Sequence, residues 1–214
     1  MGLRIDCQVH MGKEPADPRQ RILDVALKVF AHNGYAGASI QKIVDRAGVT
    51  KPTLYYHFKS KEGLFQALID HAADERFRVM HKAAEAHEAL EDKLIAMTEA
   101  LIRHASDRRD LMRLIFSYWF GPPGEIPRSV HCKKGLRNRD YVRLLIQQGI
   151  KSGRLDPRYD SMELISAIMS QIFIYSMSQI LDPKFRRKPG QAHRIVRLFL
   201  EGAGAKRQSA RRAA

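Results

Sequence analysis

Apolar residues recur every three or four positions along almost the whole chain, and no segment alternates apolar and polar residues as a half-buried β-strand requires. The pattern therefore predicts an all-α protein. In the first helix Ile22, Ala26 and Phe30 share one face, and Asn33-Gly34 is the kind of pair at which a helix ends.

Three further helices are expected over residues 39–72. Ser39 is placed to cap a short helix that Gly48 closes, and Thr50 caps a second one with Pro52 in its first turn. Ser60 caps the next, longer helix. Because Gly48 permits the positive φ of a sharp turn, the two short helices match a helix-turn-helix in which one face of the second helix stays free.

From about residue 88 the spacing predicts five more helices, with breaks at residues 121–124 and 155–157. The most apolar helix covers Met162–Leu181 and is long enough to cross a membrane. It also carries Glu163 and several Gln and Ser residues, which a bilayer would disfavour. We expect a helix buried within the protein.

Composition limits the chemistry that is available. The 214 residues include 37 Lys or Arg against 23 Asp or Glu, a formal charge of +14, which indicates a polyanionic partner. Cys7 and Cys132 form no paired-cysteine motif, and no histidine pair has metal-binding spacing. Since phosphate-loop, GxSxG and HExxH motifs are also missing, we expect no enzyme, no metal and no cofactor. The N-terminus lacks the pattern of a signal peptide, and a reducing, intracellular setting is expected.

The free face of the second short helix is unusual for a surface that only meets water. It presents hydrogen-bond donors suited to phosphates and base edges, including two adjacent tyrosines. These outward residues are Lys51, Thr53, Tyr55, Tyr56 and His57.

The run Arg21–Ile69, RILDVALKVFAHNGYAGASIQKIVDRAGVTKPTLYYHFKSKEGLFQALI, resembles the DNA-binding domain of the tetracycline-repressor (TetR) family of transcriptional regulators. The resemblance implies that the second short helix enters the major groove of double-stranded operator DNA. It suggests base-reading positions at Gln41, Lys51, Pro52 and Thr53, and contacts to the DNA backbone from Ser39, Tyr55, Tyr56, His57 and Lys61. A structural hydrogen bond is the alternative role for His57.

The family resemblance further implies a larger helical domain that binds an effector and forms a homodimer on a pseudo-palindromic operator. The expected organisation is a mobile N-terminal segment (1–17), a helix-turn-helix domain (18–63), an effector-binding and dimerisation domain (64–203) and a basic disordered tail (204–214). The setting implied is the bacterial cytoplasm, on the nucleoid, with no membrane partner.

Two residue sets are candidates in that larger domain, and each residue of the effector set could instead simply fill the core. An aromatic cluster with few polar groups suits a small organic effector. The effector candidates are Phe77, Met97, Leu101, His104, Phe116, Tyr118, Trp119 and Phe120. The dimer candidates on the last two helices are Ile165, Ile168, Met169, Ile172, Phe173, Ile195, Leu198 and Phe199.

A sequence-neutral, architectural DNA-binding protein is the alternative to a ligand-responsive repressor. Residues 1–61 contain ten Lys or Arg against five Asp or Glu, so most of the excess charge lies elsewhere. A specificity ratio distinguishes the two, since a regulator prefers its operator by at least about a thousandfold.

Overall fold

The computed structural model describes residues 17–182 and 184–204, and over these residues the chain forms nine α-helices. All but Asp17 of the predicted mobile segment and all but Gly204 of the predicted basic tail lie outside the described residues. The helices are α1 (Pro18–Gly37), α2 (Ile40–Ala47), α3 (Lys51–Phe58), α4 (Lys61–Ala84), α5 (Leu90–Asp107), α6 (Arg109–Phe120), α7 (Lys133–Lys151), α8 (Ser161–Leu181) and α9 (Gln191–Ala203).

The predicted all-α fold with an N-terminal helix-turn-helix is confirmed. The expected end of the first helix is present only as an interruption: Gly34 has φ 70° and ψ 177°, and a last turn continues to Gly37. Ala38 N–H then closes that turn on the Tyr35 carbonyl at 3.4 Å.

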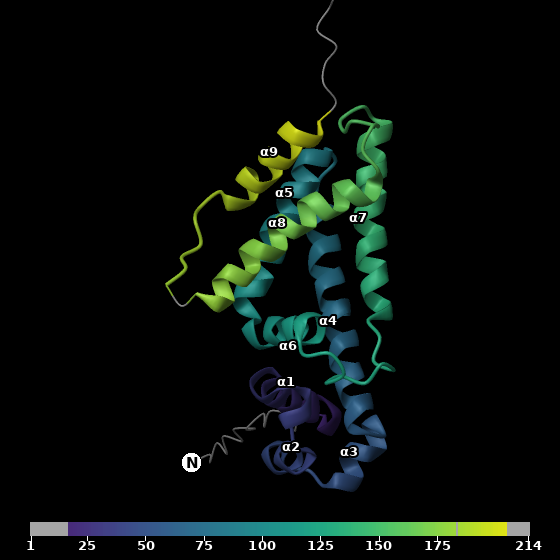
Figure 1. The fold of residues 1–214 in the computed structure, drawn as a ribbon, viewed down its shortest axis with the longest axis vertical. Coiled ribbons are helices and arrows are strands. Elements are labelled where there is room, and N and C mark those ends of the chain that lie inside the picture. Colours follow the sequence, from purple (N-terminus) through teal and green to yellow (C-terminus); the bar gives the residue numbers. More distant parts are fainter. Residues whose placement is uncertain (1–16, 183, 205–214) are drawn as a thin grey trace, which may run out of the picture.

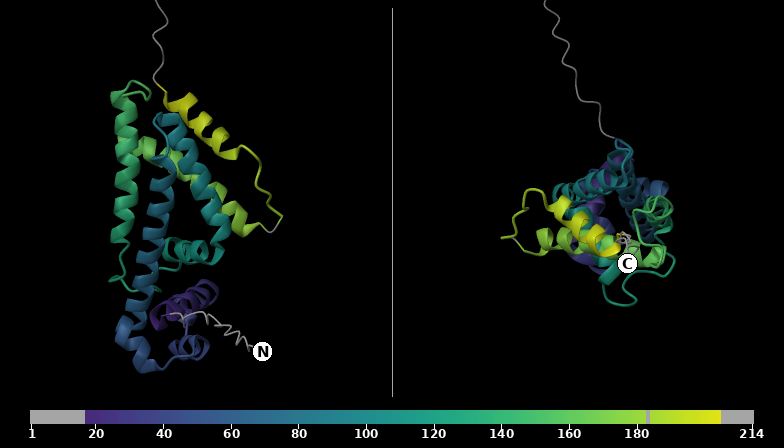
Figure 2. Two further views of the ribbon diagram at one scale, coloured as in Figure 1. Left: turned by 180° about the vertical axis from the view of Figure 1, so that it is seen from behind. Right: turned by 90° about the horizontal axis from the view of Figure 1, so that it is seen from above.

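Two hydrophobic cores follow one another along the molecule (Figure 1). The first joins α1, α2 and α3 to the N-terminal part of α4 and to α6. The second joins the C-terminal part of α4 to α5, α7, α8 and α9. Figure 2 shows α4 running from the helix-turn-helix into the larger body, with α7 alongside it. The domain boundary predicted after residue 63 falls inside α4, whose two ends serve different cores.

Helix α8 is, within the described residues, the one helix long and apolar enough to cross a membrane. It packs against α5, α7 and α9, and Leu164, Ile168 and Ile172 are buried among them. A core helix of a folded protein passes the same test of length and composition. Glu163 completes a capping box by accepting a hydrogen bond from Asp160 N–H at 2.8 Å, so this acidic residue has a structural role at the helix start.

Candidate nucleic-acid interface and effector cavity

Local capping builds the helix-turn-helix. The Ser39 side chain accepts a hydrogen bond from Lys42 N–H at 3.5 Å, and the Thr50 side chain accepts one from Thr53 N–H at 3.3 Å. Gly48 closes α2 in the left-handed conformation, with φ 61° and ψ 43°. These residues set the sharp turn that orients α3 against α2.

Helix α3 has one buried and one exposed face. Leu54 and Phe58 are buried in the first core. On the opposite side Tyr55 is 42% exposed and Tyr56 75% exposed. Lys51 and Pro52 are exposed at the start of the helix, so the candidate DNA face that the sequence predicts lies open to solvent.

Several polar members of this face hold one another in place. Gln41 Nε2 donates to Asp45 Oδ1 at 2.7 Å, and the hydroxyls of Thr50 and Thr53 lie 2.9 Å apart. The half-buried His57 ring lies edge-on to the Tyr56 ring, with 5.2 Å between the centroids. Because the pairs are at the surface, their hydrogen bonds can be exchanged for bonds to DNA.

Lys61 lies against α1. Its ammonium donates to the Ala36 carbonyl at 3.2 Å and lies 4.8 Å from the centroid of the Tyr35 ring. Burial lowers the pKa of Lys61, although the charge of Glu125 opposes the shift.

Lys59, which is not among the predicted contacts, directly follows α3 and lies beside its exposed face. Its Nζ lies 5.7 Å from the Tyr56 ring centroid, and its φ of 66° is rare for a residue other than glycine. Its position in the sequence, shortly after Tyr55 and Tyr56, is the feature that could have added this basic residue to the candidate DNA face.

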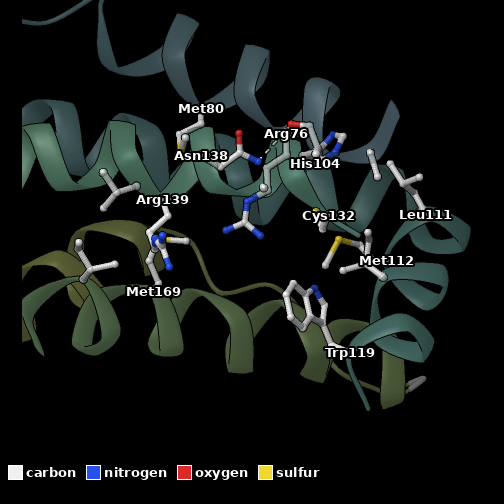
Figure 3. A pocket seen from close by; sticks show the side chains of 16 residues that line it. Arg76, Met80, His104, Leu111, Met112, Trp119, Cys132, Asn138, Arg139 and Met169 are labelled. Atoms are coloured by element: carbon white, nitrogen blue, oxygen red, sulfur yellow. Dashed lines mark hydrogen bonds between the residues drawn. The ribbon is translucent and has the colours of Figure 1, made fainter. Parts of the chain in front are cut away.

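A cavity of about 270 Å³ lies in the larger domain, between α4, α5, α6, α7 and α8 (Figure 3). Most of its wall is apolar. The larger apolar side chains are Met80, Leu111, Met112, Ile115, Trp119, Val142, Ile165 and Met169.

Three polar side chains enter this wall. Asn138 Nδ2 donates to the Ala73 carbonyl at 3.1 Å, but its buried Oδ1 has no hydrogen-bond partner. Arg76 Nε is also buried without a partner, and burial lowers the pKa of the guanidinium. Burial likewise lowers the pKa of His104, against the opposing charge of Glu75, and so favours its neutral form.

The structure brings only two of the predicted effector residues, His104 and Trp119, to this cavity. Met97 and Leu101 are buried in the second core. The centroid of the Phe77 ring lies 4.1 Å from the guanidinium carbon of Arg137, outside the cavity wall.

The other three aromatic candidates lie elsewhere. Phe116 stacks on Phe120, which also contacts Phe173, and the Tyr118 hydroxyl accepts a hydrogen bond from Cys132 N–H at 3.1 Å. Spacing along α6 places these aromatics on the helix but does not reveal which neighbouring helix each one faces.

The predicted dimer residues divide in a similar way. Ile165, Ile168, Ile172, Ile195 and Phe199 are buried in the chain's own second core. Met169 and Phe173 are half-buried, and Leu198 is 64% exposed. The apolar residues that α8 and α9 leave exposed include Ile174, Leu181 and Leu198.

A helix-turn-helix with an exposed second helix, carried on a helical body with a mostly apolar, partly open cavity, is the arrangement of a DNA-binding regulator with a separate sensing domain. Residues 22–68 match the family model "Bacterial regulatory proteins, tetR family". Residues 22–68 therefore carry the DNA-binding domain of this family of transcriptional regulators, and a DNA-binding transcriptional regulator is the function that the match supports.

Similar proteins agree with this assignment. The chain is 27% identical over 155 residues to the transcriptional repressor ComR of Escherichia coli, covering 70% of this chain and 73% of ComR. It is 35% identical over 103 residues to the transcriptional activator FasR of Mycolicibacterium smegmatis, covering 48% of this chain and 47% of FasR. The fold also resembles the regulator FadR of Bacillus subtilis, solved in complex with stearoyl-CoA, with a TM-score of 0.71 and 20% identity over 86% of this chain and 98% of that one.

Proposed function

We propose that the protein is a ligand-responsive repressor that binds a pseudo-palindromic operator as a homodimer. The observation that carries this proposal is the exposed face of α3, where Lys51, Tyr55 and Tyr56 meet solvent although two of them are large aromatics. Lys51 can reach guanine O6 or N7, while the tyrosines can pack on sugar and donate to phosphate.

The dimer interface is proposed on the outer face of α8 and α9. Ile174 and Leu198 are exposed there beside the small residues Ser166, Ala167 and Ser170, which permit close helix approach. A two-fold dimer presents the same α3 face to each half-site, about one helical turn of DNA apart.

The α6–α7 connection, residues 121–132, is proposed to carry the ligand signal. Trp119, just before it, and Cys132, at its end, both line the cavity. Between them Glu125 accepts a hydrogen bond from Ala36 N–H, at the end of α1, at 3.2 Å.

The same connection is attached to the start of α4. The Gln66 side chain donates to the His131 carbonyl at 2.9 Å and accepts from His131 N–H at 2.8 Å, and the Ser129 hydroxyl donates to Glu62. A ligand that moves Trp119 would therefore act on the two helices that frame the helix-turn-helix. DNA release follows if the favoured conformer no longer matches the half-site spacing.

The test is selection of bound duplexes from a random pool, followed by titration of the best sequence and a scrambled one at fixed salt. We expect a two-fold symmetric site that is preferred by at least about a thousandfold. Equal affinity for both duplexes would refute the regulator and favour the architectural alternative. Light scattering should give twice the 24.5 kDa chain mass, and a monomer on operator DNA would refute the dimer.

A further inference from the structure

The cavity contains a cation for which the protein itself supplies no counter-charge. None of the sixteen residues that line the cavity is acidic, whereas Arg76 and Arg139 are both basic. Within the described part of the chain, no hydrogen bond or ion pair occupies the Arg76 side chain, and its buried Nε has no acceptor. In Figure 3 the Arg76 side chain points from α4 into the space between α7 and α8.

The two acidic residues next to Arg76 in the sequence are already paired. Asp74 binds Lys134 Nζ at 2.5 Å and Arg137 Nη2 at 2.7 Å. Glu75 binds Arg108 Nε at 3.0 Å. These acids therefore neutralise other cations, and the positive charge of Arg76 stays uncompensated inside a mostly apolar wall.

A buried charge without a partner is unfavourable unless a ligand of opposite charge pairs with it. A carboxylate matches a guanidinium best, because two parallel N–H···O bonds can form between them. The remaining wall, with its methionines, Ile115 and Trp119, suits an apolar body. The cavity lies just below the range of about 300–1,000 Å³ that is usual for ligand pockets, which favours a small molecule.

We propose that the effector is a small amphipathic carboxylic acid, bound as the anion with its carboxylate on Arg76 and its aliphatic or aromatic body against α6 and α8. This inference rests on the proposed function, since it names the ligand class of the same sensing cavity. A free acid fits it better than a coenzyme A thioester, whose large polar part would have to lie outside.

The test compares acids with neutral molecules of the same shape. Octanoate, phenylacetate, octanamide and phenylacetamide are titrated into the full-length protein by calorimetry, with octanoyl-CoA as a further probe. We expect at least one acid to bind about tenfold or more tightly than its amide, because a bond to a charged group is lost in the amide.

Three variants locate the effect. Arg76→Met removes the charge and should abolish the preference for acid over amide, whereas Arg76→Lys should retain part of it. Arg78→Met changes an exposed arginine on the same helix, outside the cavity wall, and should bind like the wild type. Thermal unfolding of each variant verifies that it is folded before binding is compared.

The proposal is overturned if neither acid binds, if the amides bind as tightly as the acids, or if Arg76→Met keeps the acid preference. Tighter binding of octanoyl-CoA than of octanoate would likewise refute the free-acid class. Titrating the protein against the selected operator in the absence of ligand distinguishes a failure of the ligand proposal from a failure of the proposed DNA-binding function. If specific DNA binding persists while the acids fail, only the ligand class is wrong.

Discussion

The turn between α2 and α3 depends on the left-handed conformation of Gly48, and substitution there tests how the reading helix is oriented. An added Cβ would find only Arg21 Nη1, at 4.0 Å, so space is available and the cost is conformational. An L-residue in this conformation costs roughly 1–2 kcal/mol. The unfolded chain of an alanine variant loses less entropy on folding, which returns about 0.4–1 kcal/mol. The net expectation for Gly48→Ala is a destabilisation of about 1 kcal/mol.

The assay is thermal unfolding followed by circular dichroism, at fixed protein concentration because the proposed dimer would couple stability to concentration. A loss of about 1 kcal/mol corresponds to a fall of about 2–4 °C in the melting temperature of a chain of this size. Gly48→Asn is the matched control, since asparagine visits the left-handed region more readily, and it should melt between the wild type and Gly48→Ala.

Lys59 provides the reciprocal test, because there a residue with a side chain already has φ 66°. The ψ of Lys59 is −38°, outside the left-handed helical region, and such a sparsely populated conformation costs on the order of 1–3 kcal/mol. The larger entropy of the unfolded glycine chain offsets about 0.4–1 kcal/mol of this, so Lys59→Gly should leave stability unchanged or raise it by up to about 2 kcal/mol. The reasoning is refuted if Gly48→Ala melts at or above the wild-type temperature, or if Gly48→Asn melts below Gly48→Ala.

Three further predictions concern the DNA face, a helix junction and an ion pair. Lys51→Ala should relax the preference for the operator over a scrambled duplex, whereas Tyr56→Ala should weaken binding to both duplexes alike. Anisotropy titrations at fixed salt measure the two affinities, and an unchanged ratio of operator affinity to scrambled-duplex affinity in Lys51→Ala contradicts the prediction. Gly63→Ala should destabilise the protein by about 1–3 kcal/mol, because its Cβ would lie 2.1 Å from the Phe58 carbonyl oxygen; a melting temperature that does not fall contradicts the geometry. Burial by itself would raise the pKa of Asp74, but hydrogen bonds and charges from two basic side chains of α7 outweigh it and lower the pKa. Its ion pairs therefore contribute stability above the unfolded pKa, near 4, and lose it as the pH falls through the folded pKa. Asp74→Asn should melt below the wild type at pH 7, by an amount worth about 0.2–1 kcal/mol, and the difference should shrink on acidification; a constant difference contradicts the assignment.

The helix-turn-helix could be predicted because its determinants are local. Ser39, Gly48 and Thr50 act on the backbone within a few residues of themselves, and the apolar spacing of α3 leaves Tyr55 and Tyr56 on the outer face. Caps, turn and amphipathic face are all read within one short stretch of sequence, and the structure reproduces them.

Lys61 marks the limit of local inference even in this domain. Its position at a helix start suggests a phosphate contact, but its ammonium lies on the Ala36 carbonyl, 25 residues earlier in the chain. The contact depends on where α1 ends in space, and spacing within α4 carries no information about that.

The sequence by itself determined the all-α class, the exposed face of α3 and the presence of a larger helical body, because periodicity and capping are local properties. Only the tertiary structure decided which apolar residues face a cavity, a core or a second copy, since an apolar stripe is the same whichever helix covers it. Ile168 is an example: its spacing made it a dimer candidate, but neighbouring helices of the same chain bury it. Arg76 looks like any surface arginine in the sequence, and it becomes the candidate ligand contact because four other helices close around it while the neighbouring acids pair elsewhere.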